Sequence, residues 1–218
     1  MIGLASRPGT AVLPTWWMPP TIHAPIASSS AARQAMLRAA GVEFTAAPAS
    51  INETALMKDL VAKGLEAGAI ALALAEQKAV TVSRRNPGQT VLGGDSVLAL
   101  GAELIGKSHS LAALRMLLLK LSGKTHQLIS AAALARDGRV FWHHTARARL
   151  TVRVLREEFI DSYLAREGEA LLGSVGGYHF EGRGVQLFET VEGDYFSILG
   201  LPLLPVLAQL RAQGFLES

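Results

Sequence analysis

The chain has 218 residues, of which half are hydrophobic and 18% are charged, and its net charge is +3 at pH 7. This length suits one α/β domain, or two lobes that share a core, and the composition excludes a disordered chain. The weak positive charge favours an anionic ligand but is too small to argue for nucleic acid by itself. The absence of cysteine excludes disulfides, thiolate metal sites and a cysteine nucleophile.

The first 22 residues differ in composition from the rest. They contain four prolines and no continuous apolar segment after a basic start, a pattern that is poor for a signal peptide. We expect an irregular extension over residues 1–22, with Met18 as an alternative start; its two tryptophans leave packing against the domain open. The longest apolar run, residues 67–75, is far shorter than the roughly 20 residues of a membrane span. We therefore expect one domain over residues 23–218 and no membrane partner.

Periodicity and turn residues predict the elements of the first half of this domain. In chain order they are a strand (23–28), a helix that stops at Gly41 (31–41), an extended segment (42–51), a helical stretch with a break near Gly64 or Gly68 (55–85), a turn (86–89), and a strand and hairpin (90–107).

The second half continues the alternation of helices and strands. In chain order we expect a helix with a glycine stop (110–123), two strands joined by the turn pair Asp137-Gly138 (125–155), a helix (156–172), glycine-rich strands and loops (176–202), and a closing helix (203–214). This order predicts an α/β fold with a mixed sheet flanked by helices.

Three serines and an arginine stand where the first strand gives way to a helix, in the stretch IASSSAAR over residues 26–33. A helix start exposes unpaired backbone N–H groups and the positive end of the helix dipole, which together make an anion site. The hydroxyls of Ser28 and Ser30 add hydrogen-bonding groups, and Arg33 can bind a phosphate with two donors. The alternative is that a serine simply caps the helix.

Two acids and two lysines are further candidates, although each alone has an ordinary explanation. Asp95 follows an apolar strand in a glycine-rich turn, where a carboxylate can bind a metal or orient a water molecule, or simply stabilise the turn. Glu53 opens a helix, where the dipole favours an acid. Lys78 lies on an apolar helix and Lys107 follows a hairpin; each alone is explained as a solvated lysine.

Several other features have structural explanations that compete with functional ones. Glu181, between Phe180 and a glycine, could face a nucleobase, within a glycine block that also suits hairpin turns. The stretch RARLTVRV places Arg149, Thr151 and Arg153 on one strand face and Leu150, Val152 and Val154 on the other. Without interleaved aromatic residues, this basic face is better explained as solvated than as nucleic-acid binding. The adjacent residues His143 and His144 point to opposite faces of the strand and make a poor metal pair.

Taken together, these blocks resemble the Maf family of nucleoside triphosphate pyrophosphatases from about residue 26 to residue 214. That family opens with a strand and Ser-x-Ser-Pro-Arg-Arg before a helix. Here Ser28, Ser30 and Arg33 keep the frame, whereas Ala31 and Ala32 replace the proline and the first arginine. The other matching blocks are Glu53 in INE, Lys78 in EQKA, Gly94-Asp95, Gly106-Lys107 with Ser108 in place of proline, LSGKTH, and VEGDYFSILGLPL.

The resemblance implies a Maf/ITPase-like fold and a role for each matched residue. Ser28, Ser30 and Arg33 would bind the triphosphate, and Lys78 and Lys107 would neutralise its charge. Carboxylates such as Glu53 and Asp95 would hold a divalent cation, Mg²⁺ or Mn²⁺. Asp95 would also be the base for the water that attacks the α-phosphorus, with pyrophosphate as the leaving group. The resemblance further implies a cytoplasmic enzyme and a homodimer.

Base specificity is implied by three positions at which the family's subgroups differ, here Ala32, Ser96 and Glu181. The pyrimidine-type subgroup has arginine, threonine and glutamine there, so the chain departs from it at all three. A carboxylate accepts hydrogen bonds only, which suits the N1–H and N2–H₂ donors of guanine. Glutamate is the residue of the 7-methyl-GTP-type subgroup, although that subgroup has larger residues than Ala32 and Ser96. We therefore expect a guanine-type substrate such as 7-methyl-GTP.

Two other functions compete with catalysis at this stage. The family takes its name from an effect on septum formation, so a nucleotide-binding regulator of division is one alternative. The second is a nucleic-acid-binding protein that uses the strand over residues 147–156; steep salt dependence of polynucleotide binding would identify it.

Overall fold

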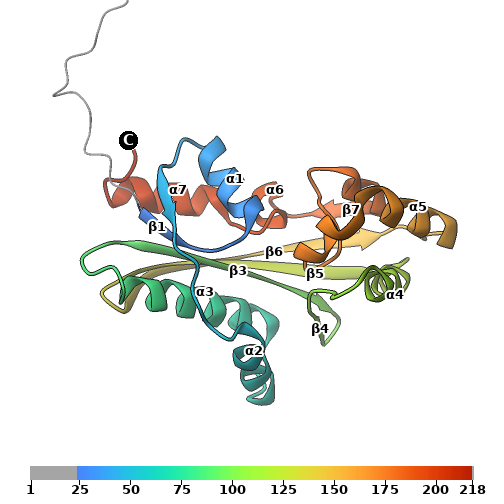
Figure 1. Cartoon of the computed structure of the whole chain (residues 1–218), viewed down its shortest axis with the longest axis horizontal. Helices are drawn as coiled ribbons and strands as arrows, with labels where there is room; N and C mark the ends of the chain where they lie inside the picture. The colour runs from blue at the N-terminus through green and yellow to red at the C-terminus, as the bar shows by residue number, and fades with distance from the viewer. Residues whose placement is uncertain (1–23, 218) are drawn as a thin grey trace, which may run out of the picture.

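A seven-stranded mixed sheet forms the centre of the computed structural model, which describes residues 24–217 (Figure 1). The strand order is β2-β1-β3-β5-β6-β7, and β4 pairs with β3. β1 is parallel to β2 and β3, whereas the other pairs are antiparallel. The predicted α/β class with a mixed sheet is confirmed. The strands are β1 (Ala24–Ala27), β2 (Phe44–Ala46), β3 (Val91–Leu100), β4 (Glu103–Ile105), β5 (Thr125–Arg136), β6 (Arg139–Val152) and β7 (Phe188–Glu192).

The helices follow most of the sequence-based boundaries. Gly41 (φ 72°) ends α1 in the left-handed conformation, and Gly64 (φ 76°) provides the break between α2 and α3. Gly68 lies inside α3. None of the helices in residues 24–217 is both long and apolar enough to span a membrane. The helices are α1 (Ala31–Ala39), α2 (Glu53–Ala62), α3 (Ala67–Ser83), α4 (Leu111–Leu121), α5 (Glu157–Glu167), α6 (Tyr195–Ile198) and α7 (Leu203–Ala212), with 3₁₀ segments η2 (Gly168–Gly173) and η3 (Arg183–Leu187).

Helices cover both faces of the central strands. α3 packs against one face, where Ala131, Ala133 and Ala135 of β5 are fully buried. α1 and α7 pack against the other face, where Leu92 and Leu134 belong to a second cluster (Figure 1). Because both of its faces are covered, β5 is buried over most of its length and has a nearly continuous apolar sequence.

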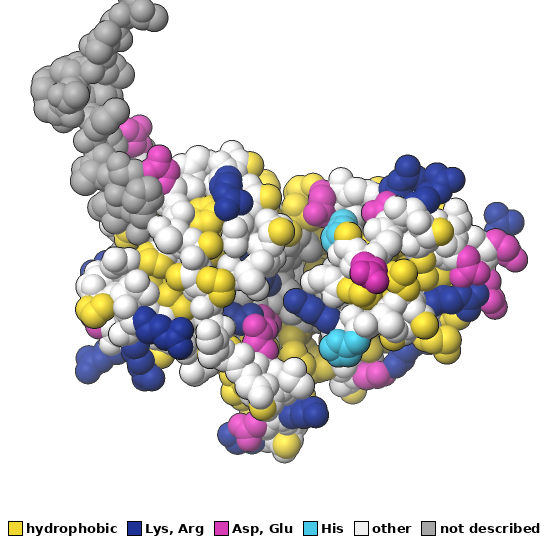
Figure 2. All heavy atoms as spheres, in the orientation of Figure 1, with side chains coloured by type: hydrophobic (Ala, Val, Ile, Leu, Met, Phe, Trp, Pro, Cys, Tyr) yellow, Lys and Arg dark blue, Asp and Glu magenta, His cyan; other side chains and the backbone are white. Residues whose placement is uncertain are grey.

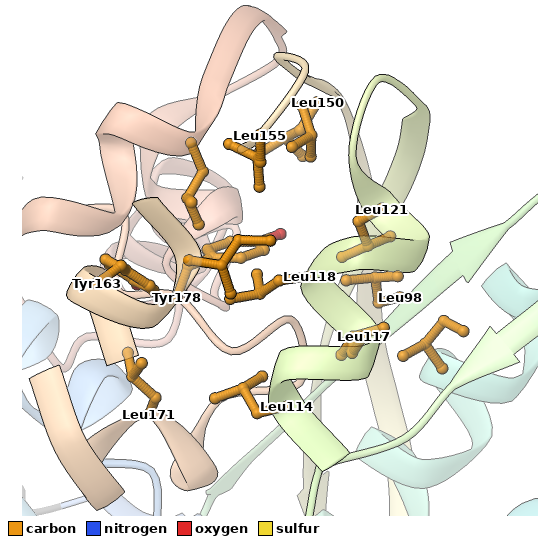
Figure 3. Packing of buried hydrophobic residues seen from close by; sticks show 14 of the residues in the cluster. Leu98, Leu114, Leu117, Leu118, Leu121, Leu150, Leu155, Tyr163, Leu171 and Tyr178 are labelled. Atoms are coloured by element: carbon orange, nitrogen blue, oxygen red, sulfur yellow. The ribbon is translucent and has the colours of Figure 1, made fainter. Parts of the chain in front are cut away.

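A third cluster forms a second lobe at the other end of the sheet. The apolar face of α4, with Leu114, Leu118 and Leu121, packs toward Tyr163 of α5 and Tyr178 of the glycine-rich segment (Figure 3). The chain therefore has two lobes on one shared sheet.

Three sequence-based predictions need correction. Asp95 was expected in a glycine-rich turn after an apolar strand, but Gly93, Gly94 and Asp95 lie inside β3, where they pair with β5. The glycine-rich segment 176–202 was expected to form strands and loops, but it contains one strand, β7, with η3 before it and α6 after it. Val154 was placed on the buried face with Leu150 and Val152, yet it is 78% exposed because β6 ends at Val152. The predicted extension over residues 1–22 lies outside the described residues.

Gly93 sets how closely α3 approaches β3. A Cβ atom at Gly93 would overlap the carbonyl oxygen of Ala75 and lie 2.8 Å from the backbone nitrogen of Ala79. Because helix backbone cannot yield as a flexible side chain does, α3 must shift when Gly93 gains a methyl group.

We expect Gly93→Ala to lower the free energy of unfolding by about 1–3 kcal/mol. Denaturant unfolding of the purified variant measures this loss. Gly173→Ala is the matched control, because nothing lies within 4 Å of its added Cβ. A Gly93→Ala protein as stable as the wild type would contradict the close approach of α3.

Candidate active site

A gap in strand pairing along one edge of β3 opens the candidate site. β1 pairs with β3 only at Leu92 and Gly93, and β4 pairs with it only from Leu98 to Leu100. Between them, no described strand pairs with this edge at residues 94–97. Figure 2 shows the surface hollowed between the lobe that carries α1 and α7 and the lobe that carries α4 and α5, with acidic and basic side chains at the hollow. Asp95 and Ser96 lie in the gap, and their side chains point to opposite faces of the sheet.

Lys78 is the centre of the charged group on the α3 face. Its Nζ lies 2.6 Å from Asp95 Oδ1 and 2.9 Å from Glu53 Oε2. Lys78 and Asp95 are each 6% exposed, whereas the Glu53 side chain is 49% exposed. Three residues predicted from separate motifs thus meet, and two carboxylates surround one ammonium.

Local structure fixes each member of this group. Asn52 caps α2 by accepting from the backbone N–H of Ala55, which places Glu53 in the first turn, where an acid is favourable. Lys78 lies on the face of α3 that packs on the sheet. Because Gly93 lets α3 approach β3, the short Asp95 side chain reaches the lysine.

Arg33 is the centre of a second group on the opposite face. Its Nη1 donates to Ser28 Oγ at 3.3 Å, its Nη2 to Ser96 Oγ at 2.9 Å, and its Nε to the carbonyl oxygen of Gly200 at 2.7 Å. Arg33 is 8% exposed, and burial lowers the pKa of its guanidinium although Asp95 and Glu53 act to raise it. These three bonds use three of the five guanidinium N–H groups, which leaves two for a ligand.

Ser30 caps helix α1 at the same helix start that was predicted to bind an anion. Ser30 is the N-cap of α1 and accepts from the backbone N–H of Arg33. The N–H groups of Ala31 and Ala32 precede the first intrahelical bond, so this helix start is suited to an anion. Both the capping role and the positive helix end therefore occur here, beside the Arg33 guanidinium.

Sequence reasoning missed the part of this cluster that follows β7. Ser96 Oγ lies 2.8 Å from Ser130 Oγ, and Ser130 donates to the carbonyl oxygen of Ser197 at 2.8 Å. Asp194 caps α6 by accepting from the N–H and hydroxyl of Ser197. The only sequence signals were a lone hydroxyl within the apolar run of β5 and the VEGDYFSILGLPL block. The turn after α6 thus closes over the Arg33 cluster.

Lys107 and Glu181 lie apart from both groups. Lys107 is exposed in the loop after β4, and Glu181 is exposed on the glycine-rich loop before η3. Neither makes a hydrogen bond or ion pair with another described residue.

Arg149 of β6 and Arg153, which directly follows this strand, have protein partners, which favours a structural face over a nucleic-acid site. Arg153 Nε donates to the carbonyl oxygen of Gln186, and its guanidinium lies 4.2 Å from the Phe159 ring centroid. Arg149 Nε lies 3.9 Å from Glu192 Oε2.

The two histidines on opposite faces also have different neighbours: His143 contacts Glu76, and His144 stacks on Trp142.

Comparison with known proteins identifies the family. The model of the Maf-like protein family matches residues 25–213. The chain belongs to the Maf family. It is 49% identical over 198 residues to a 7-methyl-GTP pyrophosphatase of Brucella abortus, covering 91% of this chain and 100% of that protein.

Two further relatives match a similar share of this chain. The chain is 50% identical to a 7-methyl-GTP pyrophosphatase of Mesorhizobium japonicum and 47% identical to a nucleoside triphosphate pyrophosphatase of Hyphomonas neptunium. Each comparison covers 88% of this chain and 97% of the relative.

The donor set of this Maf protein suits a metal ion that binds together with substrate. Among residues 24–217, no cluster of three or more histidines, aspartates and glutamates is arranged to hold a metal. Glu53 and Asp95 each have a second carboxylate oxygen that is not the atom in contact with Lys78. Mg²⁺ commonly binds one or two carboxylates together with substrate phosphates, so this pair fits such an ion.

His126 anchors the loop that carries Glu181. It is 1% exposed, and its Nε2 lies 2.9 Å from the hydroxyl of Tyr178, three residues before Glu181. Its Nδ1 is buried without a hydrogen-bond partner among the described residues. Burial therefore lowers the pKa of His126 to about 4, because an imidazolium here would leave a charged N–H unpaired.

This pKa predicts a pH-dependent stability difference between wild type and His126→Phe. Unfolded histidine binds a proton below about pH 6.5 and folded His126 only below about pH 4, so wild type loses stability as pH falls through this window. Between pH 7.5 and pH 5, the free energy of unfolding of the variant should rise by about 2 kcal/mol relative to that of the wild type. Denaturant unfolding at both pH values measures the difference, with exposed His109→Gln as control. Parallel pH curves for wild type and His126→Phe would contradict the buried neutral imidazole.

Proposed function

We propose that this Maf protein, a nucleoside triphosphate pyrophosphatase, hydrolyses 7-methyl-GTP to 7-methyl-GMP and pyrophosphate. The observation that carries the proposal is the Glu53–Lys78–Asp95 group at the unpaired edge of β3, beside the Arg33 cluster. Relatives at 49–50% identity that carry the name 7-methyl-GTP pyrophosphatase support the choice of substrate.

The triphosphate binds at the start of α1. The N–H groups of Ala31 and Ala32, the Ser30 hydroxyl and the two remaining donors of Arg33 are the groups available to phosphate oxygens. Lys107 supplies a further positive charge from the loop after β4. Because an NTP carries several negative charges, these donors and positive charges bind it. Bound there, the nucleotide has its reacting phosphate beside Asp95.

Hydrolysis then needs a positioned water molecule and charge neutralisation. Asp95 takes a proton from the water through the oxygen that does not contact Lys78. The water oxygen bonds to the α-phosphorus, the bond from that phosphorus to the bridging oxygen breaks, and pyrophosphate leaves. Lys78 orients Asp95 and offsets the charge that develops on the phosphate.

A divalent cation, Mg²⁺ or Mn²⁺, completes the proposed site. The second oxygen of Glu53 would hold it together with substrate phosphate oxygens, beside the Asp95 carboxylate. When bound, the ion supplies charge neutralisation for the triphosphate and for the leaving pyrophosphate.

Glu181 is the proposed determinant of base specificity. Its carboxylate accepts from the N1–H and N2–H₂ donors of guanine, which uracil and thymine do not present in this arrangement. Ala32 and Ser96 complete the specificity positions; Ala32 neighbours Arg33, and Ser96 bonds to it.

The assembled Glu53–Lys78–Asp95 group favours an enzyme over a regulator of division that only binds nucleotides. The homodimer and the cytoplasmic location stay predictions of the family resemblance.

We expect Asp95→Asn to reduce kcat for 7-methyl-GTP by about 10²–10⁴-fold, the usual contribution of general acid–base catalysis. Nucleotide affinity should stay within about threefold, because the phosphate-binding donors remain. Pyrophosphate release with Mg²⁺ or Mn²⁺ measures kcat, and circular dichroism checks folding. Asp161→Asn is the control, because this exposed aspartate pairs with Arg115 on the second lobe. A folded Asp95→Asn protein with wild-type turnover would remove Asp95 from the mechanism.

We expect Glu181→Gln to shift base preference from guanine toward pyrimidines. Loss of hydrogen bonds to a charged acceptor should lower kcat/KM for 7-methyl-GTP by about 10–100-fold relative to UTP. A panel of 7-methyl-GTP, GTP, UTP, dTTP, CTP and ITP measures this ratio. Glu189→Gln, an exposed glutamate on β7, is the control. An unchanged ratio would show that Glu181 does not read the base.

A further inference from the structure

Tyr195 presents a half-exposed aromatic ring at the seam between the two lobes. Its side chain is 47% exposed, and its ring centroid lies 5.9 Å from that of Phe180 and 5.7 Å from that of Phe196. Phe180 packs against the cluster of the α4–α5 lobe, whereas Phe196 packs against the cluster of α1 and α7. The ring is therefore held from both lobes and keeps an open surface.

The same short helix connects Tyr195 to the phosphate cluster. Tyr195 is the first residue of α6, and the carbonyl oxygens of Ser197 and Gly200 accept from Ser130 and Arg33. A helix of four residues is only about 6 Å long, so the backbone of Tyr195 lies close to the Ser197 carbonyl that contacts this cluster.

On its other side, Tyr195 contacts the loop proposed to read the base. Phe180, its ring neighbour, immediately precedes Glu181. Tyr195 therefore connects the segment that contacts Arg33 to the loop that carries Glu181.

We propose that Tyr195 stacks on the base of the substrate and selects 7-methyl-GTP over GTP; this inference rests on the proposed function. Methylation at N7 gives guanine a delocalised positive charge that GTP lacks. A cation over an aromatic face is stabilised by the ring quadrupole, so Tyr195 favours the methylated base. Glu181 recognises the donors shared by both bases, whereas Tyr195 recognises the charge.

Three variants separate stacking from simple packing. Tyr195→Leu keeps apolar bulk without a π face and should lower the ratio of kcat/KM for 7-methyl-GTP to that for GTP by about 2–30-fold. Tyr195→Phe and Tyr195→Trp keep the ring, so the ratio should be retained in the first and retained or raised in the second. Phe141→Leu is the control, because Phe141 is also an exposed aromatic, at 43%, but lies on β6 beside Arg136.

The outcomes separate this inference from the proposed function. Wild-type protein that hydrolyses other nucleotides but not 7-methyl-GTP would overturn the proposed substrate and, with it, the stacking role. Wild-type hydrolysis of 7-methyl-GTP combined with an unchanged ratio in Tyr195→Leu would overturn stacking alone. If kcat/KM for both nucleotides falls by the same factor in Tyr195→Leu, the ratio is also unchanged, and the ring only packs. If Tyr195→Leu does not fold, Tyr195→Trp replaces it as the test. A fall in the ratio of kcat/KM for 7-methyl-GTP to that for GTP in Tyr195→Trp would then overturn the proposal.

Discussion

The buried contact between Lys78 and Asp95 is the interaction on which the rest of the site depends. Moving both charges out of water is costly, and a buried pair is tolerated only when its geometry is close and its other hydrogen-bonding groups are satisfied. Here the Nζ–Oδ1 distance is 2.6 Å, and Glu53 adds a second carboxylate at 2.9 Å. The contact requires that α3 lie close to β3, which Gly93 permits. Removing Lys78 would leave the buried Asp95 carboxylate without its counter-charge, so the packing of α3 and the chemistry of the site are coupled.

The alternation of β3 places two different groups on either side of one strand. Asp95 faces α3 and the lysine, whereas Ser96 faces Arg33 and, through Ser130 and Gly200, the segment around α6. Because neither β1 nor β4 pairs with this edge at residues 94–97, both groups border the same opening. A fold in which β1 extended further along β3 would close it. The early end of β1 therefore leaves the opening that both groups border.

The sequence predicted the candidate residues better than their contacts. Helical periodicity and glycine stops identified α1, the break at Gly64 and the Asp137–Gly138 turn, because these depend on local conformation. Motif spacing identified Glu53, Lys78 and Asp95, but only the packing of α2 and α3 shows that they meet. The bond from Arg33 to Gly200 joins residues 167 positions apart, which no local pattern encodes. The glycine-rich segment was only partly predictable because tertiary contacts decide its structure: Gly177 lies against Leu114, and Tyr178 bonds to His126.

The position of the bond that breaks decides whether Asp95 directs water to the α-phosphorus, as the proposed mechanism requires. Hydrolysis of 7-methyl-GTP in water enriched in ¹⁸O, followed by mass spectrometry of both products, locates the new oxygen. If water attacks the α-phosphorus, the label enters 7-methyl-GMP and the pyrophosphate stays unlabelled. Label in pyrophosphate, or release of orthophosphate with 7-methyl-GDP, would contradict this mechanism, because water would then attack a phosphorus other than the one that the site is built to receive.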